Sequence, residues 1–230
     1  MPTFADQLRA PNDDIWNALL ANRFVAAMAD GTLPPDAFRY YIEQNLYYLP
    51  EYARAMGLGL ARATSDAVMA RFARSLAQIV DVELGNNQAL RDAVVDLGAG
   101  DHGGALEMAP ATQAYTNFLL ATASTGDEVD VLAAILPCAW SYREIAIQYR
   151  DPVQHPVYSD WLRFFSSDEY SNYLERLLDE LDDLVGPVAP ERLSRLGHLF
   201  RTGARYELAF WEQGFTLSTW PDRSPNRSAR

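Results

Sequence analysis

A single thiol stands beside a proline inside an apolar stretch of the sequence. Cys138 is the only cysteine, it directly follows Pro137, and Tyr142 lies four residues further on. Proline lacks a backbone N–H and crowds the preceding turn, so we expect a kink in the helix there. Residues four apart share a helical face, which places Cys138 beside Tyr142. A thiolate is a nucleophile, but a free cysteine is also common as small core filler, and this segment alone leaves both interpretations open.

A carboxyl group falls within the apolar stripe of the last long helical segment. Glu207 lies four residues after Gly203 and four before Trp211, on the face that should be buried. Burial raises the pKa of a carboxyl group and makes it a better general acid near neutral pH. The alternative is a structural ion pair with an arginine such as Arg143 or Arg205, because such pairs also stabilise a buried glutamate.

A third feature is a face rich in tyrosine in the segment that follows two consecutive prolines. Tyr41, Asn45, Tyr48 and Tyr52 are spaced by four, three and four residues. Aromatic stripes usually form core, but every hydroxyl and amide in this one needs a polar partner. Such a face suits a flat heteroaromatic ligand with hydrogen-bonding groups at its rim.

Metal chemistry is poorly supported by the sequence. The three histidines, His102, His155 and His198, have no second ligand at helical spacing. Glu83 has Asn86 three residues later, where a Glu-x-x-His pair would require histidine. We therefore predict no metal and no other cofactor, with His155 starting a helix and His198 in a capping or core position.

Composition narrows the classes of function further. The net charge of −12 argues against nucleic-acid binding, and all 19 basic residues are arginines, which excludes lysine-based catalysis. One cysteine excludes an internal disulfide framework. No stretch resembles a signal peptide or a membrane span, so we expect a cytoplasmic protein without membrane contact.

The elements that must position these residues are helices almost throughout. We predict one all-α domain of about eight helices over residues 1–220 and a flexible tail over 221–230. Helices are expected at about 13–29, 66–97, 110–124, 128–150, 168–184 and 190–219, from capping residues, prolines and apolar spacing. A long helix is also expected to start at 34–36 and to include 38–52, and a short one to start near 156. The clearest loop is the glycine-rich stretch 98–104.

Several segments in this order resemble the TenA family, the thiaminase II proteins. They are Asp30-Gly31-Thr32-Leu33-Pro34, Phe38-Arg39-Tyr40-Tyr41, Leu136-Pro137-Cys138-Ala139-Trp140-Ser141-Tyr142, His155-Pro156-Val157-Tyr158 and Tyr206-Glu207-Leu208-Ala209-Phe210-Trp211. The resemblance covers about residues 15–217. It implies a haem-oxygenase-like helical bundle, a homo-oligomer (tetramer or dimer), and a small aminopyrimidine or thiamin-like ligand cleaved to hydroxymethyl pyrimidine in thiamin salvage.

The resemblance also implies roles for particular residues. Cys138 matches the family's nucleophile and Glu207 its acid/base. Ligand-contacting positions are matched by Tyr48, Tyr115, Tyr142 and Phe210. Three positions depart from the family: Asn45 stands where an aspartate usually grips the pyrimidine edge, Phe165 where a tyrosine is common, and Asn22 where a histidine is common.

Three hypotheses follow from these residues. The first is a cysteine-dependent aminopyrimidine hydrolase. The second is a ligand-binding or regulatory protein that has lost this activity because of Asn45. The third is a metal-dependent oxygenase on the same fold, which the scarcity of histidine disfavours.

Overall fold

The computed structural model describes residues 2–100, 107–150 and 155–222, and these residues form helices connected by short turns. The helices are α1 (Phe4–Arg9), α2 (Asp13–Leu20), α3 (Arg23–Asp30), α4 (Pro35–Arg62), α5 (Asp66–Ala77), α6 (Leu84–Asp96), α7 (Pro110–Thr125), α8 (Glu128–Gln148), α9 (Pro156–Phe165), α10 (Asp168–Val185) and α11 (Pro190–Thr216). A 3-10 turn, η1 (Ala10–Asn12), joins α1 to α2, and a π-helical segment, η2 (Gln78–Glu83), joins α5 to α6. The predicted all-α class is confirmed.

Most helices start where the sequence places a capping group. The side chain of Ser65 accepts a hydrogen bond from Val68 N, and Asp127 forms a capping box with Asp130 at the start of α8. The first predicted helix, however, is interrupted. Asn22 takes an extended conformation and caps a new helix by accepting from Phe24 N at 2.9 Å. Its short amide competes with the helical backbone, which is why the continuous pattern at 13–29 divides into α2 and α3.

The predicted helix 66–97 is continuous but changes its winding in the middle. The π-helical segment η2 lies between α5 and α6, and Ile79 and Glu83 are its buried residues. A π segment rotates the side chains that follow it relative to an ideal α-helix, and such segments are frequent at functional sites. Here it directs a carboxyl group towards the interior.

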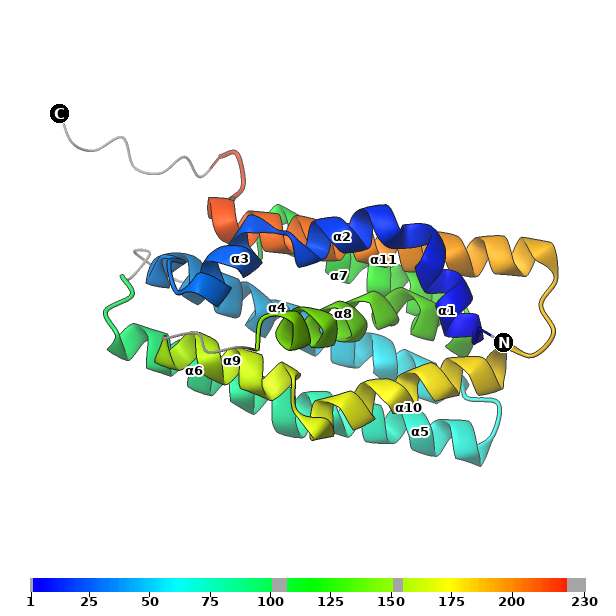
Figure 1. Cartoon of the computed structure of the whole chain (residues 1–230). Coiled ribbons are helices and arrows are strands. Elements are labelled where there is room, and N and C mark those ends of the chain that lie inside the picture. Colours follow the sequence, from blue (N-terminus) through cyan, green and yellow to red (C-terminus); the bar gives the residue numbers. More distant parts are fainter. Residues whose placement is uncertain (1, 101–106, 151–154, 223–230) are drawn as a thin grey trace.

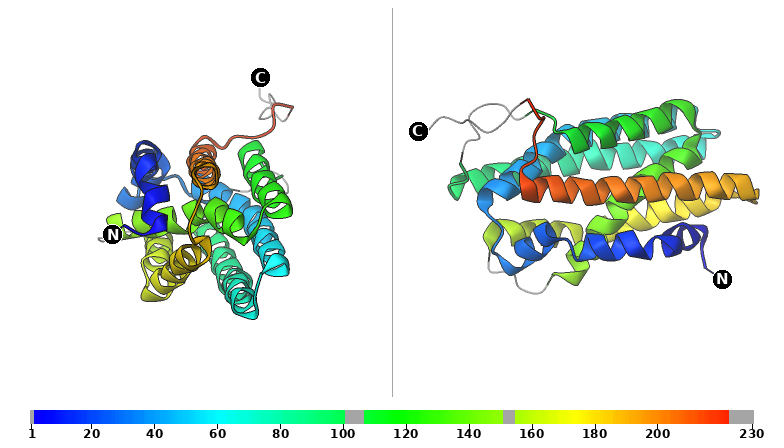
Figure 2. Two further views of the ribbon diagram at one scale, coloured as in Figure 1. Left: turned by 90° about the vertical axis from the view of Figure 1, so that its right-hand side faces the viewer. Right: turned by 90° about the horizontal axis from the view of Figure 1, so that it is seen from above.

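Helix α8 runs through the middle of the bundle and the other long helices surround it (Figures 1 and 2). Its sequence has almost no polar face, and α11, α10, α9, α7 and α2 all pack against it. Helix α4 lies alongside α5, α6, α7 and α11. A helix that is apolar on every side is stable only when it is enclosed in this way.

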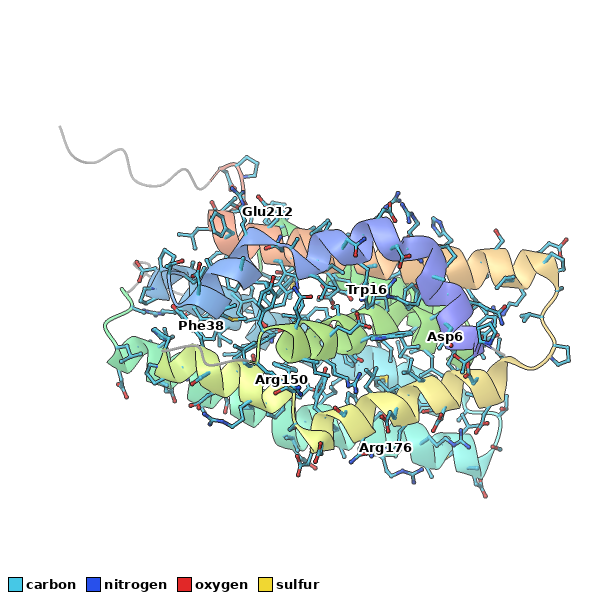
Figure 3. The ribbon with its side chains drawn as sticks, in the orientation of Figure 1. Asp6, Trp16, Phe38, Arg150, Arg176 and Glu212 are labelled. Atoms are coloured by element: carbon cyan, nitrogen blue, oxygen red, sulfur yellow. The ribbon has the colours of Figure 1, made fainter. Side chains whose placement is uncertain are left out.

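The core between these helices is strongly aromatic. Trp16 and Phe38 are fully buried, whereas charged side chains such as Arg176 and Glu212 lie on outer faces of the bundle (Figure 3). Trp16 stacks on Phe200 with ring centroids 5.9 Å apart. Large rings bury much apolar area at a small cost in side-chain entropy, and they fix the helices that carry the polar groups described below.

Arg62, near the end of α4, fastens the turn between α7 and α8. Its guanidinium donates to the carbonyl oxygens of Ala123 and Ser124, and to that of Gly126 at 2.9 Å. The last carbonyls of a helix have no partner within the helix, so one side chain here stabilises the end of α7.

Some sequence predictions fall outside the described residues. His102 and most of the loop 98–104, the predicted helix end at Asp151-Pro152, and residues 223–230 of the predicted tail are among them. Within the described ranges, no helix combines the length and the apolar character that crossing a membrane would require.

Candidate active site

A glycine allows α11 to approach α8 closely next to Pro137. A Cβ atom added at Gly203 would lie 2.7 Å from the carbonyl oxygen of Ala134 and 3.0 Å from Cγ of Pro137. Helix α8 continues through Pro137 without a break. One turn further along α11, this close approach brings Glu207 to the position of Cys138.

Glu207 and Cys138 are neighbours, as the sequence predicted. Glu207 is buried, and the Tyr115 hydroxyl donates to its Oε1 at 2.7 Å. The Cys138 thiol is its second hydrogen-bonding neighbour. A nucleophile and a carboxyl group therefore meet at the junction of α7, α8 and α11.

Burial raises the pKa of Glu207 to about 7, while hydrogen bonds from Tyr115 and Cys138 act in the opposite direction. The alternative prediction of an arginine partner is wrong. Arg143 donates to the Ser171 hydroxyl at 3.1 Å, and Arg205 is exposed. Since the neighbours of Glu207 are a phenol and a thiol, the group can hold or release a proton close to neutral pH.

Cys138 is only partly buried, although the residues on both sides of it are fully buried. Burial raises the pKa of its thiol well above the usual value, the charge of Glu207 raises it further, and a hydrogen bond with Tyr48 lowers it. A thiol in this setting needs both a proton acceptor and donors that stabilise the thiolate. Glu207 can serve as the acceptor and Tyr48 as a donor.

Aromatic rings surround this pair. Tyr48 lies 4.8 Å from Tyr115 and 5.7 Å from Phe210, measured between ring centroids. Tyr142 contacts Phe165 at 4.9 Å. All five rings are buried, so the structure brings together the aromatic residues that the sequence selected. Flat rings at such distances form walls suited to another planar molecule.

Three further aromatic residues order this wall. The Tyr41 hydroxyl lies 3.2 Å from that of Tyr142, and Trp161 Nε1 donates to Tyr41 at 3.1 Å. The indole ring of Trp211 stacks on Tyr41 at 4.8 Å. The sequence placed Tyr41 and Trp211 on inward faces. The role of Trp161 was missed because the apolar face of α9 predicts burial but does not show that the indole reaches Tyr41.

Asn45 is buried and already has a polar partner. Its Nδ2 donates to Asn87 Oδ1 at 2.8 Å, and Asn87 Nδ2 donates to the carbonyl oxygen of Glu83 at 2.9 Å. One of the two N–H groups of Asn45 is thereby engaged, and the amide keeps its oxygen and its second N–H for a ligand. The sequence analysis did not place Asn87 and Glu83 at this site, because it considered Glu83 only as a possible metal ligand.

The structure describes two of the three histidines, His155 and His198. His155 caps α9 as predicted, accepting from Tyr158 N at 3.4 Å, whereas His198 is exposed, contrary to the predicted capping or core position. Across residues 2–100, 107–150 and 155–222, no three His, Cys, Asp or Glu side chains are grouped as metal ligands would be.

Residues 9–216 match the TENA/THI-4/PQQC family, and the chain belongs to it. An aminopyrimidine aminohydrolase from Halalkalibacterium halodurans is 30% identical over 95% of this chain and 98% of its own length. A protein of the same name from Helicobacter pylori is 31% identical over 87% of this chain and 93% of its own.

Solved structures agree with this family assignment. A TenA homologue from P. horikoshii superposes with a TM-score of 0.83 at 31% identity, covering 94% of this chain and 99% of that one. A TenA family transcription regulator from Silicibacter also gives 0.83, at 28% identity, with 93% and 96% covered. A Shewanella denitrificans domain described as having a heme oxygenase-like fold gives 0.68 at 15% identity over 96% and 97%, which confirms the predicted fold.

Proposed function

We propose that this protein is a cysteine-dependent aminopyrimidine hydrolase of the thiaminase II type, acting in thiamin metabolism. The observation that carries the proposal is the contact of Cys138 with Glu207 inside a buried aromatic wall. The full-length similarity to aminopyrimidine aminohydrolases supports it.

The geometry accounts for the reaction as two half-steps. Cys138 transfers its proton to Glu207, and the thiolate adds to the electron-poor pyrimidine ring. Electrons then move towards the methylene substituent, and Glu207 returns the proton to the departing amine; a thiazolium leaves as the neutral thiazole and needs no proton. Water adds to the methylene carbon, the carbon–sulfur bond breaks, and hydroxymethyl pyrimidine leaves with the thiol restored. A carboxyl group with a pKa of about 7 suits both proton transfers.

The aromatic residues bind and orient the ring. Tyr48, Tyr115, Tyr142, Phe165 and Phe210 supply stacking faces, and Asn45 accepts a hydrogen bond from the pyrimidine amino group. The Asn45 amide carries no charge and cannot stabilise a protonated ring nitrogen as a carboxylate would. Binding at this edge is therefore weaker than with aspartate.

The test is product formation from defined substrates. The protein is incubated with thiamin and, separately, with aminomethyl aminopyrimidine, and hydroxymethyl pyrimidine is measured. We expect turnover of the latter, and losses of at least ~10²-fold in Cys138→Ala and Glu207→Gln, the scale for loss of a nucleophile or an acid/base group. Turnover in both variants at the wild-type rate would exclude these roles.

A binding or regulatory role is the second candidate, and Asn45 is the observation that favours it. One of its two N–H donors is engaged by Asn87, so fewer groups remain to bind the pyrimidine. Binding of hydroxymethyl pyrimidine in a calorimeter, without turnover of either substrate, would select this function.

We also propose a cytoplasmic homo-oligomer, a tetramer or dimer. Partly exposed apolar side chains lie along the outer side of α5, η2 and α6: Met69, Val80, Val82, Val95 and Leu97. Such a surface favours association with another copy. Light scattering measures the mass, and a monomer at micromolar concentration would contradict the proposal. The chain's acidity leaves nucleic acid outside the proposed partners.

A further inference from the structure

Two buried asparagines and a backbone carbonyl form a short hydrogen-bonded chain between α4 and α6. Asn45 donates from Nδ2 to Oδ1 of Asn87 at 2.8 Å, and Asn87 donates from Nδ2 to the carbonyl oxygen of Glu83 at 2.9 Å. Asn45 and Asn87 are 3% and 1% exposed. A buried amide is costly unless it is hydrogen-bonded, so the folded protein keeps both contacts.

Asn87 enters this chain from the interior face of α6. The π-helical segment η2 ends at Glu83, and Asn87 and Leu90 are the next buried residues along the chain. The side chain of Asn87 folds back onto the carbonyl four residues earlier, a contact that short polar side chains make within helices. Both ends of its amide are therefore engaged within the fold.

The carbonyl group of Glu83 fixes the direction of the two hydrogen bonds. A backbone carbonyl can only accept, so the nitrogen of Asn87 faces it and the oxygen of Asn87 faces Asn45. That oxygen in turn requires a donor, so the nitrogen of Asn45 faces Asn87. Turning Asn87 over would set its oxygen against the Glu83 carbonyl, and turning Asn45 over would set two side-chain oxygens against each other. A backbone atom thus determines the orientation of the Asn45 amide.

The oxygen of Asn45 is left to accept from a ligand. It accepts no hydrogen bond from the residues that the structure describes. Asn45 lies between Tyr41 and Tyr48 on the inward face of α4, and Tyr48 packs against Tyr115 and Phe210. The open edge of the amide, an acceptor beside one remaining N–H, therefore belongs to the same helical face as the aromatic wall.

An acceptor beside a donor is complementary to one kind of pyrimidine edge. A 4-aminopyrimidine places an amino N–H beside a ring nitrogen that accepts. The 4-oxo counterpart places a carbonyl oxygen beside a ring N–H, which is the reverse pattern. An amide that is free to turn over can match either edge. An amide held in one orientation matches only the first, because the second sets oxygen against oxygen and N–H against N–H.

We propose that Asn87 is a positioning residue that holds the Asn45 amide in one orientation and thereby makes the site select a 4-aminopyrimidine over the corresponding 4-oxopyrimidine. Asn87 acts through Asn45, and the direction of its own hydrogen bond to Glu83 sets the selectivity. The inference rests on the proposed function, since the pyrimidine has to bind beside Asn45.

Binding measures this selectivity without turnover. The probes are hydroxymethyl pyrimidine and its analogue with an oxo group in place of the ring amino group. Each is titrated in a calorimeter into the wild type and into variants of Asn87 at one pH, and the ratio of the two Kd values is compared. A purely structural role of Asn87 would weaken both ligands alike and leave this ratio unchanged.

We expect the wild type to bind the amino form at least ~10²-fold more tightly, the scale for polar groups left opposed in a buried site. Asn87→Leu is close in size but cannot hydrogen-bond, so it lets the Asn45 amide turn over and should reduce the ratio at least ~10-fold. Asn87→Asp should keep the ratio. A carboxyl group buried at this position takes up a proton, so it can donate to the Glu83 carbonyl and accept from Asn45.

Asn86→Leu is the matched control on the same helix, because Nδ2 of Asn86 has no hydrogen-bond partner among the described residues. Its ratio should equal that of the wild type. Far-UV circular dichroism verifies folding, and Asn87→Ala, which removes the same two hydrogen bonds, replaces Asn87→Leu if that variant does not fold.

A wild-type ratio in Asn87→Leu would overturn the inference, and so would a ratio in Asn87→Asp as low as in Asn87→Leu. In both cases the proposed function would stand, because the wild type still binds the pyrimidine. A wild type that binds neither probe would contradict the proposed function together with this inference.

Discussion

The close approach of α11 to α8 gives a sharp prediction at Gly203. In Gly203→Ala the new Cβ would lie 2.7 Å from a backbone oxygen, that of Ala134, and backbone cannot rotate away as a side chain can. Overpacking in a core costs about 1–3 kcal/mol, whereas replacing a helical glycine by alanine gains about 0.5–1 kcal/mol. We therefore expect a net loss of about 1–2 kcal/mol in the free energy of unfolding.

Gly197 provides the matched control on the same helix. A Cβ added there meets nothing within 4 Å, so Gly197→Ala should show only the propensity gain. Unfolding of both variants in urea or by heat is compared at one protein concentration. For a chain of this size, 1 kcal/mol corresponds to about 2–4 °C in Tm. We expect opposite signs for the two variants.

Gly203→Ala should also lower activity, because α11 must move outwards and take Glu207 away from Cys138. A misplacement of about 1 Å can cost ~10²-fold in rate. If Gly203→Ala stabilises the protein as much as Gly197→Ala does, the argument that Gly203 sets the distance between the helices is refuted.

Three further predictions concern charge and substrate recognition. Burial raises the pKa of Glu207 to about 7 and of Glu83 to about 8, so the folded state favours the protonated carboxyl groups. Their stabilising effect is complete below about pH 4.5 and is lost as pH rises through these values, so the free energy of unfolding should fall over that window. Glu207→Gln should make the free energy of unfolding less dependent on pH. Asn45→Asp should raise kcat/KM for aminomethyl aminopyrimidine, and an unchanged value in a steady-state assay would show that Asn45 does not contact the ring edge. Asp130→Asn should destabilise the fold by about 2–4 kcal/mol in urea, since a buried carboxylate that binds Arg192 and Arg195 at 2.7 and 3.0 Å would be lost; a change below about 0.5 kcal/mol would contradict this.

Prolines, capping residues and apolar spacing predicted most of the helical architecture. The start of α4 at Pro35, of α7 at Pro110 and of α11 at Pro190 follows from the fixed φ angle of proline. The sequence analysis missed that the predicted helix 13–29 is divided at Asn22. The apolar spacing is continuous there, and one capping amide is a weak signal against it. The π-helical segment η2 was missed for a different reason: it depends on packing against α4 and has no residue signature of its own.

The candidate site was predictable where residue types are unusual for their surroundings. A lone thiol after Pro137 and a carboxyl group at Glu207 stand out against apolar neighbours. The hydrogen bond from Tyr115 to Glu207 could not be read from the sequence, since the residues are 92 positions apart and their contact depends on the packing of α7 against α11. The sequence analysis considered Glu83 only as a possible metal ligand, and its burial became evident only in the structure.

The guanidinium of Arg62 has an effect far from its own position. By holding the carbonyls at the end of α7 and in the turn to α8, it sets how far α7 can slide along α4. Tyr48 and Tyr115 face each other across these two helices at 4.8 Å, and a slip of one residue would move one ring by about 1.5 Å against the other. Arg62 lies about four helical turns from Tyr48 along α4 and still determines how the Tyr48 and Tyr115 rings are aligned.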